Sequence, residues 1–237
     1  MKLIEVQNVI KSFNDLKVLD GISFTVSPGE SIAIVGPSGV GKSTLLRIIA
    51  GLELFDSGEV IVNAKKLSMV FQYSALLNSY TVGENIALAL HDSNLTNIEK
   101  EEKVLEVLKL VGLERYFHRF PDQLSGGQKK RIGFARAIAN NPEVILYDEP
   151  TSGLDPILST LIEDYINKLS REFEVASIVV THQLSTIKRT ANHVLMLYEG
   201  GIVWQGNPQE FIRTENPYVK QFVNAEVVGP ILSTLLE

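Results

Sequence analysis

The fold of this chain is decided by the stretch Gly36-Pro37-Ser38-Gly39-Val40-Gly41-Lys42-Ser43-Thr44, which fits the phosphate-binding loop pattern G-x-x-x-x-G-K-[ST]. The apolar run at residues 31–35 predicts a buried strand before it, and residues 44–50 predict a helix after it. A chance lysine in a glycine-rich turn is the alternative, and the flanking strand and helix argue against it. In this order, backbone N–H groups and a helix N-terminus converge on phosphate. The sequence therefore predicts that the whole stretch binds a nucleotide, with Lys42 on the β- and γ-phosphates and Ser43 on Mg²⁺.

Composition limits the class of protein and its partners. The chain has 237 residues, a net charge of −6 and 45% hydrophobic residues, which are ordinary values for a globular protein. The acidic balance argues against nucleic acid as the main partner. With no cysteine, disulfides and thiolate metal sites are excluded. Because no run approaches the ~18 apolar residues of a membrane span, and Glu5 interrupts any signal peptide, we expect membrane association only through a partner.

Hydrophobic periodicity predicts an α/β chain with an inserted helical segment. Alternating or continuous apolar runs predict strands at residues 2–7, 22–26, 60–62, 67–71, 144–147, 176–180, 194–197 and 202–205. The segment from about 73 to 135 is mostly helical, and it begins with a capping box at Thr81 and Glu84. Further helices are expected at residues 128–140, 156–171, 184–191 and from Asn207. The tail, about 216–237, has no clear pattern.

Other signals follow the phosphate-binding loop in a fixed order. Gln72 follows a strand, Leu124-Ser125-Gly126-Gly127-Gln128 opens a helix, Asp148 and Glu149 end a buried strand, and His182 ends another. Together they resemble the ATP-binding subunits of ABC transporters over essentially the whole chain. That resemblance implies one domain, residues 1–237. Its fold would be a P-loop NTPase core with a mixed sheet and helices, an antiparallel β subdomain and an inserted α-helical subdomain at about 73–135.

The resemblance also implies the roles of the residues around the phosphates. Lys42 would neutralise charge, while Ser43 and Asp148 would hold Mg²⁺. Glu149 would be the general base for the attacking water, and His182 would hold the γ-phosphate. The alternatives are a helix cap for the two acids and a satisfied core position for His182.

Two more positions follow from the same resemblance. Gln72 would sense the metal and the γ-phosphate, and would report that state to the helical subdomain. Phe13 matches the aromatic residue that stacks on adenine. An ordinary core position is an equally good reading of Phe13.

The pentapeptide ending at Gln128 bears on assembly. Ser125, Gly126, Gly127 and Gln128 start a helix, so their N–H groups form a second phosphate cradle. In the family, this signature closes on the ATP of another subunit, which implies a head-to-tail dimer of two copies with Asp155 at the interface. The basic residues at 129–131 and 136 are expected to form a solvated helix face.

A finer resemblance concerns the cargo. Residues 71–85, 147–157, 216–223 and 229–231 look like the Mla/Mce phospholipid-transport ATPases. The resemblance implies a lipid cargo, a membrane permease docked near residues 73–85 and an Mce-domain lipid-binding protein reached through it. The chain would sit on the cytoplasmic face of the inner membrane.

The chain also departs from that pattern. Gln128 replaces a common methionine, Gln183 replaces a common aspartate, and the stretch 58–72 is short. The alternative is the ATPase of an amino-acid, ion or other importer or exporter. A non-transport ABC ATPase is disfavoured because the chain has neither a long coiled coil nor a second ATPase domain, and a non-catalytic regulatory module because the catalytic residues are intact.

Overall fold

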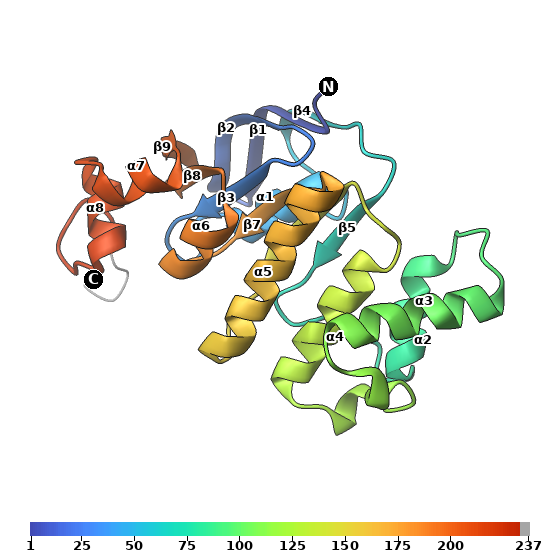
Figure 1. The fold of residues 1–237 in the computed structure, drawn as a ribbon. Helices are drawn as coiled ribbons and strands as arrows, with labels where there is room; N and C mark the ends of the chain where they lie inside the picture. Colours follow the sequence, from blue (N-terminus) through green and yellow to red (C-terminus); the bar gives the residue numbers. More distant parts are fainter. Residues whose placement is uncertain (233–237) are drawn as a thin grey trace.

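The computed structural model describes residues 1–232, and its centre is a six-stranded sheet in the order β5-β6-β7-β3-β8-β9 (Figure 1). All neighbouring pairs are parallel except β8 and β9, which form an antiparallel hairpin. The strands are β3 (Ser31–Val35), β5 (Leu67–Val70), β6 (Val144–Asp148), β7 (Ala176–Val180), β8 (His193–Tyr198) and β9 (Gly201–Gly206). Every residue of β3, β6 and β7 is buried, as their continuous apolar runs predict.

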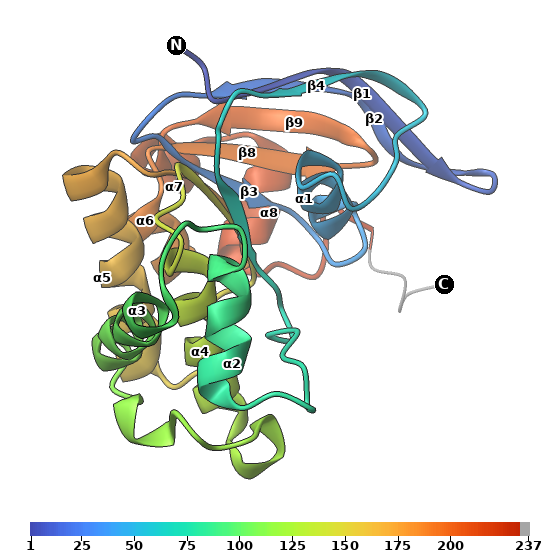
Figure 2. The same cartoon turned by 90° about the vertical axis from the view of Figure 1, so that its right-hand side faces the viewer.

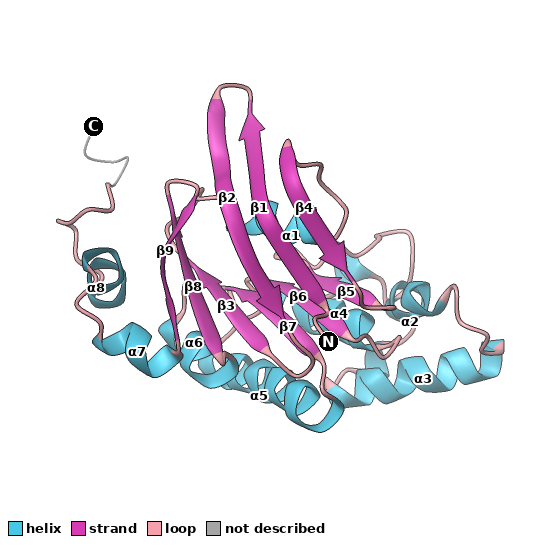
Figure 3. Cartoon of the chain, turned by 90° about the horizontal axis from the view of Figure 1, so that it is seen from above, coloured by secondary structure: helices cyan, strands magenta, loops and turns pink. Residues whose placement is uncertain are grey.

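A second, antiparallel sheet has the order β2-β1-β4 and lies over the first (Figure 3). Its strands are β1 (Ile4–Phe13), β2 (Leu16–Val26) and β4 (Ser57–Val62). The predicted strands at 2–7 and 22–26 are too short, because register shifts after Val6 and Val9 break the alternation that marks a strand. Helix α1 (Lys42–Ile49) packs between the two sheets, where Leu45 and Leu46 are fully buried.

The segment between β5 and β6 is helical, and Figure 2 shows it as a separate layer below the sheets. It contains α2 (Val82–Ala87), α3 (Asn97–Leu110) and α4 (Gly126–Ile138), with short 3₁₀ turns at Leu88–Leu90, Glu114–Tyr116 and Pro121–Gln123. The capping box predicted at Thr81 and Glu84 is confirmed, since each side chain bonds the other residue's backbone N–H. Phe134 of α4 stacks on Tyr147 of β6, which joins this layer to the main sheet.

The remaining helices cover the face of the main sheet that points away from α1 and from the second sheet. They are α5 (Pro156–Phe173), α6 (Leu184–Thr190), α7 (Pro208–Arg213) and α8 (Pro217–Asn224). Asn216 caps α8 in the unpatterned tail, by accepting from the backbone N–H groups of Tyr218 and Val219. Residues 233–237 of the predicted tail lie outside the described residues. Among residues 1–232, no helix is both long enough and apolar enough to cross a membrane.

Candidate functional site

The phosphate-binding loop leaves the carboxyl end of the central strand β3 and enters α1 (Figure 1). Gly36 and Gly41 both have positive φ, 143° and 100°. A Cβ on Gly36 would lie 2.3 Å from the carbonyl oxygen of Leu197, and one on Gly41 would lie 2.7 Å from Cγ1 of Val18. Glycine is therefore required at both positions, and the loop backbone lies directly against β8 and β2.

Lys42 folds back over the loop. Its Nζ donates to the carbonyl oxygens of Gly36, at 2.8 Å, and Pro37, at 2.6 Å. Burial lowers the pKa of Lys42, and the nearby carboxylates of Glu149 and Asp148 oppose that shift. A buried ammonium whose ligands are neutral carbonyls is suited to a more negative ligand such as phosphate.

Ser43 and Asp148 are 105 positions apart in the sequence and meet near this ammonium. The hydroxyl of Ser43, at the start of α1, donates to Oδ1 of Asp148, at the end of β6, over 2.8 Å. Asp148 is 3% exposed. Hydroxyl and carboxylate oxygens are the ligands that Mg²⁺ takes, usually with substrate phosphates completing its coordination. Among residues 1–232, no group of three or more His, Cys, Asp or Glu side chains is placed to hold a metal ion. The oxygens of Ser43 and Asp148 fit a metal whose other ligands would include a phosphate.

Glu149 follows Asp148 and is held in the left-handed region, with φ of 50°. Its Oε1 lies 2.8 Å from Nδ1 of His182, which follows β7. Its Oε2 is buried and has no hydrogen-bond partner. A buried carboxylate oxygen without a donor fits a base that awaits a water or another ligand. The His182 side chain is 59% exposed, so it is not a core histidine.

The two other predicted residues, Gln72 and Phe13, lie beyond or at the end of a strand. Gln72 is half-buried, two residues beyond β5, which pairs with β6 and so ends beside Asp148. Phe13 ends β1, is 43% exposed and has Nζ of Lys11 at 4.6 Å from its ring centroid. Its partly exposed ring excludes a core position.

The signature residues are Ser125, Gly126, Gly127 and Gln128, and they stand at the start of α4. They are the one predicted group of site residues that does not lie near Lys42 of the same chain. Ser125 and Gln128 form a capping box, in which Ser125 Oγ accepts from the N–H of Gln128 and Gln128 Oε1 accepts from the N–H of Ser125. Gly126 is exposed. Figures 1 and 2 both show α4 in the helical layer and α1 between the sheets.

The prediction of a solvated basic face on α4 is wrong for Lys130, Arg131 and Arg136. Lys130 donates to the carbonyl oxygens of Glu149, at 3.3 Å, and Ser152. Arg131 donates to the carbonyl of Val111. Arg136 donates to the carbonyls of residues 74 and 75, which follow Gln72. Helical periodicity spreads these three residues around α4 and does not say which backbone lies opposite each of them, so the sequence held no signal for these contacts.

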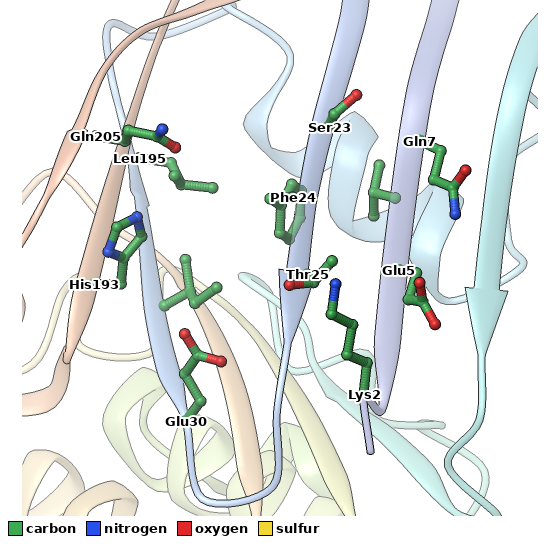
Figure 4. Close-up of a pocket in the computed structure, with 12 residues that line it drawn as sticks. Lys2, Glu5, Gln7, Ser23, Phe24, Thr25, Glu30, His193, Leu195 and Gln205 are labelled. Carbon is green, nitrogen blue, oxygen red and sulfur yellow. The ribbon is translucent and has the colours of Figure 1, made fainter.

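A hollow of about 500 Å³ lies between the two sheets (Figure 4). Its lining mixes Lys2, Glu5, Glu30 and His193 with neutral side chains from β1, β2, β3, β8 and β9. None of the predicted site residues lines it, so it is distinct from the cluster around Lys42.

The comparisons with known proteins agree with this geometry. Residues 19–152 match the family model described as ABC transporter. The chain is 43% identical to the Arabidopsis thaliana protein TRIGALACTOSYLDIACYLGLYCEROL 3, chloroplastic, over 97% of its own length and 75% of that protein. The chain belongs to the ABC transporter family. This ABC chain is also 41% identical to a probable amino-acid import ATP-binding protein, YxeO of Bacillus subtilis, over 93% of its own length and 96% of that protein.

Solved ABC cassettes confirm the predicted fold class. The chain superposes on the dimeric bacterial ABC transporter cassette MJ0796 with a TM-score of 0.82 and 32% identity, covering 86% of this chain and 98% of that one. A post-hydrolysis dimer of the same cassette, bound to ADP and Pi, gives a TM-score of 0.81. As an ABC ATPase subunit, this chain binds ATP, with Mg²⁺ as the usual cation, and hydrolyses it to drive transport.

Proposed function

We propose that this ABC chain is the ATPase subunit of a lipid transporter, and that two copies of it drive one membrane permease. The observation that supports hydrolysis best is the position of Glu149. Its Oε1 contacts His182, its Oε2 is buried without a partner, and it follows directly on Asp148, the partner of Ser43.

Each residue then has a defined task. Lys42 moves its ammonium from the loop carbonyls to the β- and γ-phosphates. Ser43, Asp148 and Gln72 hold Mg²⁺, which when bound neutralises phosphate charge. Glu149 accepts a proton from the attacking water at Oε2, while His182 orients the carboxylate through Oε1 and holds the γ-phosphate.

The adenine side of the site is provided by the β1–β2 hairpin. Val18 of that hairpin lies against Gly41 of the loop, so the exposed Phe13 is on an element that already contacts the nucleotide site. Phe13 stacks on the adenine ring, and residues 36–44 surround the phosphates.

A second copy completes each site. The capping box uses the N–H groups of Ser125 and Gln128, and leaves those of Gly126 and Gly127 available in the first turn of α4. Ser125, Gly126, Gly127 and Gln128 all stand at the start of α4 and do not face Lys42 of their own chain. In a head-to-tail homodimer they close on the ATP of the partner, as two phosphate cradles on opposite sides of one nucleotide. The dimeric state of the MJ0796 cassettes supports this arrangement.

The lipid cargo rests on two supports. One is the similarity to a plant protein whose name contains that of a galactolipid. The other is the segment at residues 73–85, which resembles the Mla/Mce ATPases and exposes Tyr73, Leu77 and Tyr80. This segment contacts the permease, an Mce-domain protein joins through the permease, and the subunit lies peripherally on the cytoplasmic face of the inner membrane. The domain is single over 1–237, with its helical subdomain at about 73–135 and a tail at about 216–237.

An amino-acid importer is the second candidate, because the similarity to YxeO is nearly as high and spans almost all of that protein. A pull-down of tagged chain from its native membrane in detergent, with mass spectrometry of proteins and lipids, separates the two. A permease with an Mce-domain protein and phospholipid supports the lipid cargo. A permease with a solute-binding protein refutes it and leaves the ATPase in place.

The hydrolysis scheme is tested with Glu149→Gln. The variant lacks the proton acceptor but keeps the shape of the side chain, so it should bind ATP, stop hydrolysing it and accumulate as a closed dimer. Size-exclusion chromatography with and without ATP measures this. A variant that stays monomeric at every ATP and salt concentration contradicts the two-copy scheme.

A further inference from the structure

A buried carboxylate lies outside the ATP site, on α5. Glu163 is 1% exposed, although the other buried residues of that helix, Ile162 and Ile166, are apolar. Acidic side chains are almost never fully buried unless they are paired. Glu163 is paired with Arg189 of α6, whose Nε lies 2.9 Å from its Oε2.

The other carboxylate oxygen faces a buried hydroxyl. Thr186, also on α6 and 0% exposed, donates to Oε1 of Glu163 over 2.7 Å. A hydroxyl has one proton, so with that proton on Glu163 the oxygen of Thr186 is free to accept. The hydroxyl of Thr151 lies 3.1 Å from it and is also fully buried.

Thr151 connects this pair to the ATP site. It stands two residues after Glu149, and its hydroxyl lies 3.1 Å from Oε1 of Gln183, the residue after His182. Its single proton goes either to this oxygen or to Thr186, and both partners follow His182 in the chain. The chain Glu163–Thr186–Thr151 therefore ends between the two turns that carry Glu149, the proposed base, and His182, which is proposed to hold the γ-phosphate.

The position of these two turns decides where the carboxylate of Glu149 points. Among the described contacts, His182 is the one side chain that bonds to this carboxylate. The backbone of Glu149 has positive φ, which a non-glycine residue keeps only where its surroundings hold it. Its N–H donates to the carbonyl of Val180, and its carbonyl accepts from Lys130. Thr151 fixes the following residues against the His182 turn.

We propose that Thr151, Thr186 and Glu163 are positioning residues for ATP hydrolysis. They hold the turn after Glu149 against the turn after β7, so that Glu149 and His182 keep their contact when the phosphates are bound. This inference rests on the proposed roles of Glu149 and His182.

The test is steady-state hydrolysis of Mg-ATP by the purified full chain carrying Thr186→Val, which removes the hydroxyl and keeps the shape. We expect kcat to fall about tenfold, as for the loss of one buried hydrogen bond. The KM for ATP should change less than about twofold, because Lys42 and its loop are untouched. Thr186→Ser, which restores the hydroxyl, should recover most of the rate.

Two further variants make the result specific. Thr190→Val is the matched control, since Thr190 is a buried threonine of α6 whose hydroxyl bonds only to the carbonyl of Thr186 among the described contacts, and it should keep kcat within about twofold. Thr151→Val removes the other end of the shared bond. The double variant with Thr186→Val should lose no more than either single variant, because both break the same chain.

Three results would overturn the inference. They are an unchanged kcat in a folded Thr186→Val protein, failure of Thr186→Ser to restore the rate, and losses that multiply in the double variant. If Thr186→Val does not fold, Thr151→Val carries the same test. Glu149→Gln is measured beside them: a wild-type rate in that variant refutes the proposed function itself, whereas its inactivity with an unaffected Thr186→Val refutes the positioning chain alone.

Discussion

Asn85→Asp is the substitution that tests most directly how the segment before α2 is built. Asn85 lies in α2, is 0% exposed, and its carboxamide bonds to the backbone of the segment before that helix. Its Oδ1 accepts from the N–H of Leu77 over 2.8 Å, and its Nδ2 lies 3.0, 3.0 and 2.9 Å from the carbonyl oxygens of Leu77, Tyr80 and Thr81. One carboxamide thus organises the loop that we assign to the permease contact.

The expected loss of stability in Asn85→Asp follows from these contacts. The carboxamide has two N–H groups for three carbonyls, and the substitution removes both while bringing a carboxylate against the same oxygens. Two lost bonds in a buried site cost about 3 kcal/mol, which lowers Tm by about 6–12 °C in a chain of this size. A carboxyl facing carbonyl oxygens favours its neutral form, so the loss should be smaller at pH 5 than at pH 8.

Thermal unfolding of the full chain, followed by circular dichroism at both pH values, measures the effect. Asn78→Asp is the control, because Asn78 is exposed on the same segment and the same charge is introduced there without a buried partner. The reasoning is refuted if the two variants differ in Tm by less than about 2 °C, or if the loss at pH 5 equals the loss at pH 8.

Three other predictions concern the ATP site and α4. Gly41→Ala should raise the Kd for ATP about tenfold or more without unfolding the chain, since the added Cβ would meet Val18 at 2.7 Å. Isothermal titration calorimetry measures the Kd, and an unchanged Kd would contradict the close approach of the loop to Val18. ATP binding at alkaline pH should take up protons, because burial lowers the pKa of free Lys42 and phosphates raise it. Calorimetry at several alkaline pH values, in two buffers of different ionisation enthalpy, detects this uptake, and equal heats in the two buffers throughout would count against it. Arg136→Lys should lower Tm by about 4–8 °C, because one nitrogen cannot reach both carbonyls at 74 and 75; a Tm within about 1 °C of wild type would exclude that role.

The sequence predicts the strands, most helices and the phosphate-binding loop, because each has a local signal. Residues 31–35 are continuously apolar and are followed by Gly36, and the structure makes them the buried central strand. The tail contains a local helix signal as well. Asn216-Pro217 repeats the cap that Asn207-Pro208 provides for α7, and the structure has a helix at both places.

Contacts between distant segments have no such signal. Ser43 and Asp148 are 105 positions apart, and their hydrogen bond follows from the strand order β6-β7-β3, which the sequence does not state. The buried Glu163 reads as a helix-surface acid, since its charge gives no hint of Arg189 opposite. Which oxygen of Glu149 is bonded, and which is left without a partner, depends on the left-handed turn at that residue.

Helix α4 reaches three loops through the side chains of Lys130, Arg131 and Arg136, and every acceptor is a main-chain carbonyl. A carbonyl is present whatever amino acid occupies the position. The side chain of Ala75, which is exposed, can therefore diverge during evolution to suit a different permease without breaking the link to α4. Related transporters could in this way exchange their membrane partners while the mechanical connection to the ATPase stays the same.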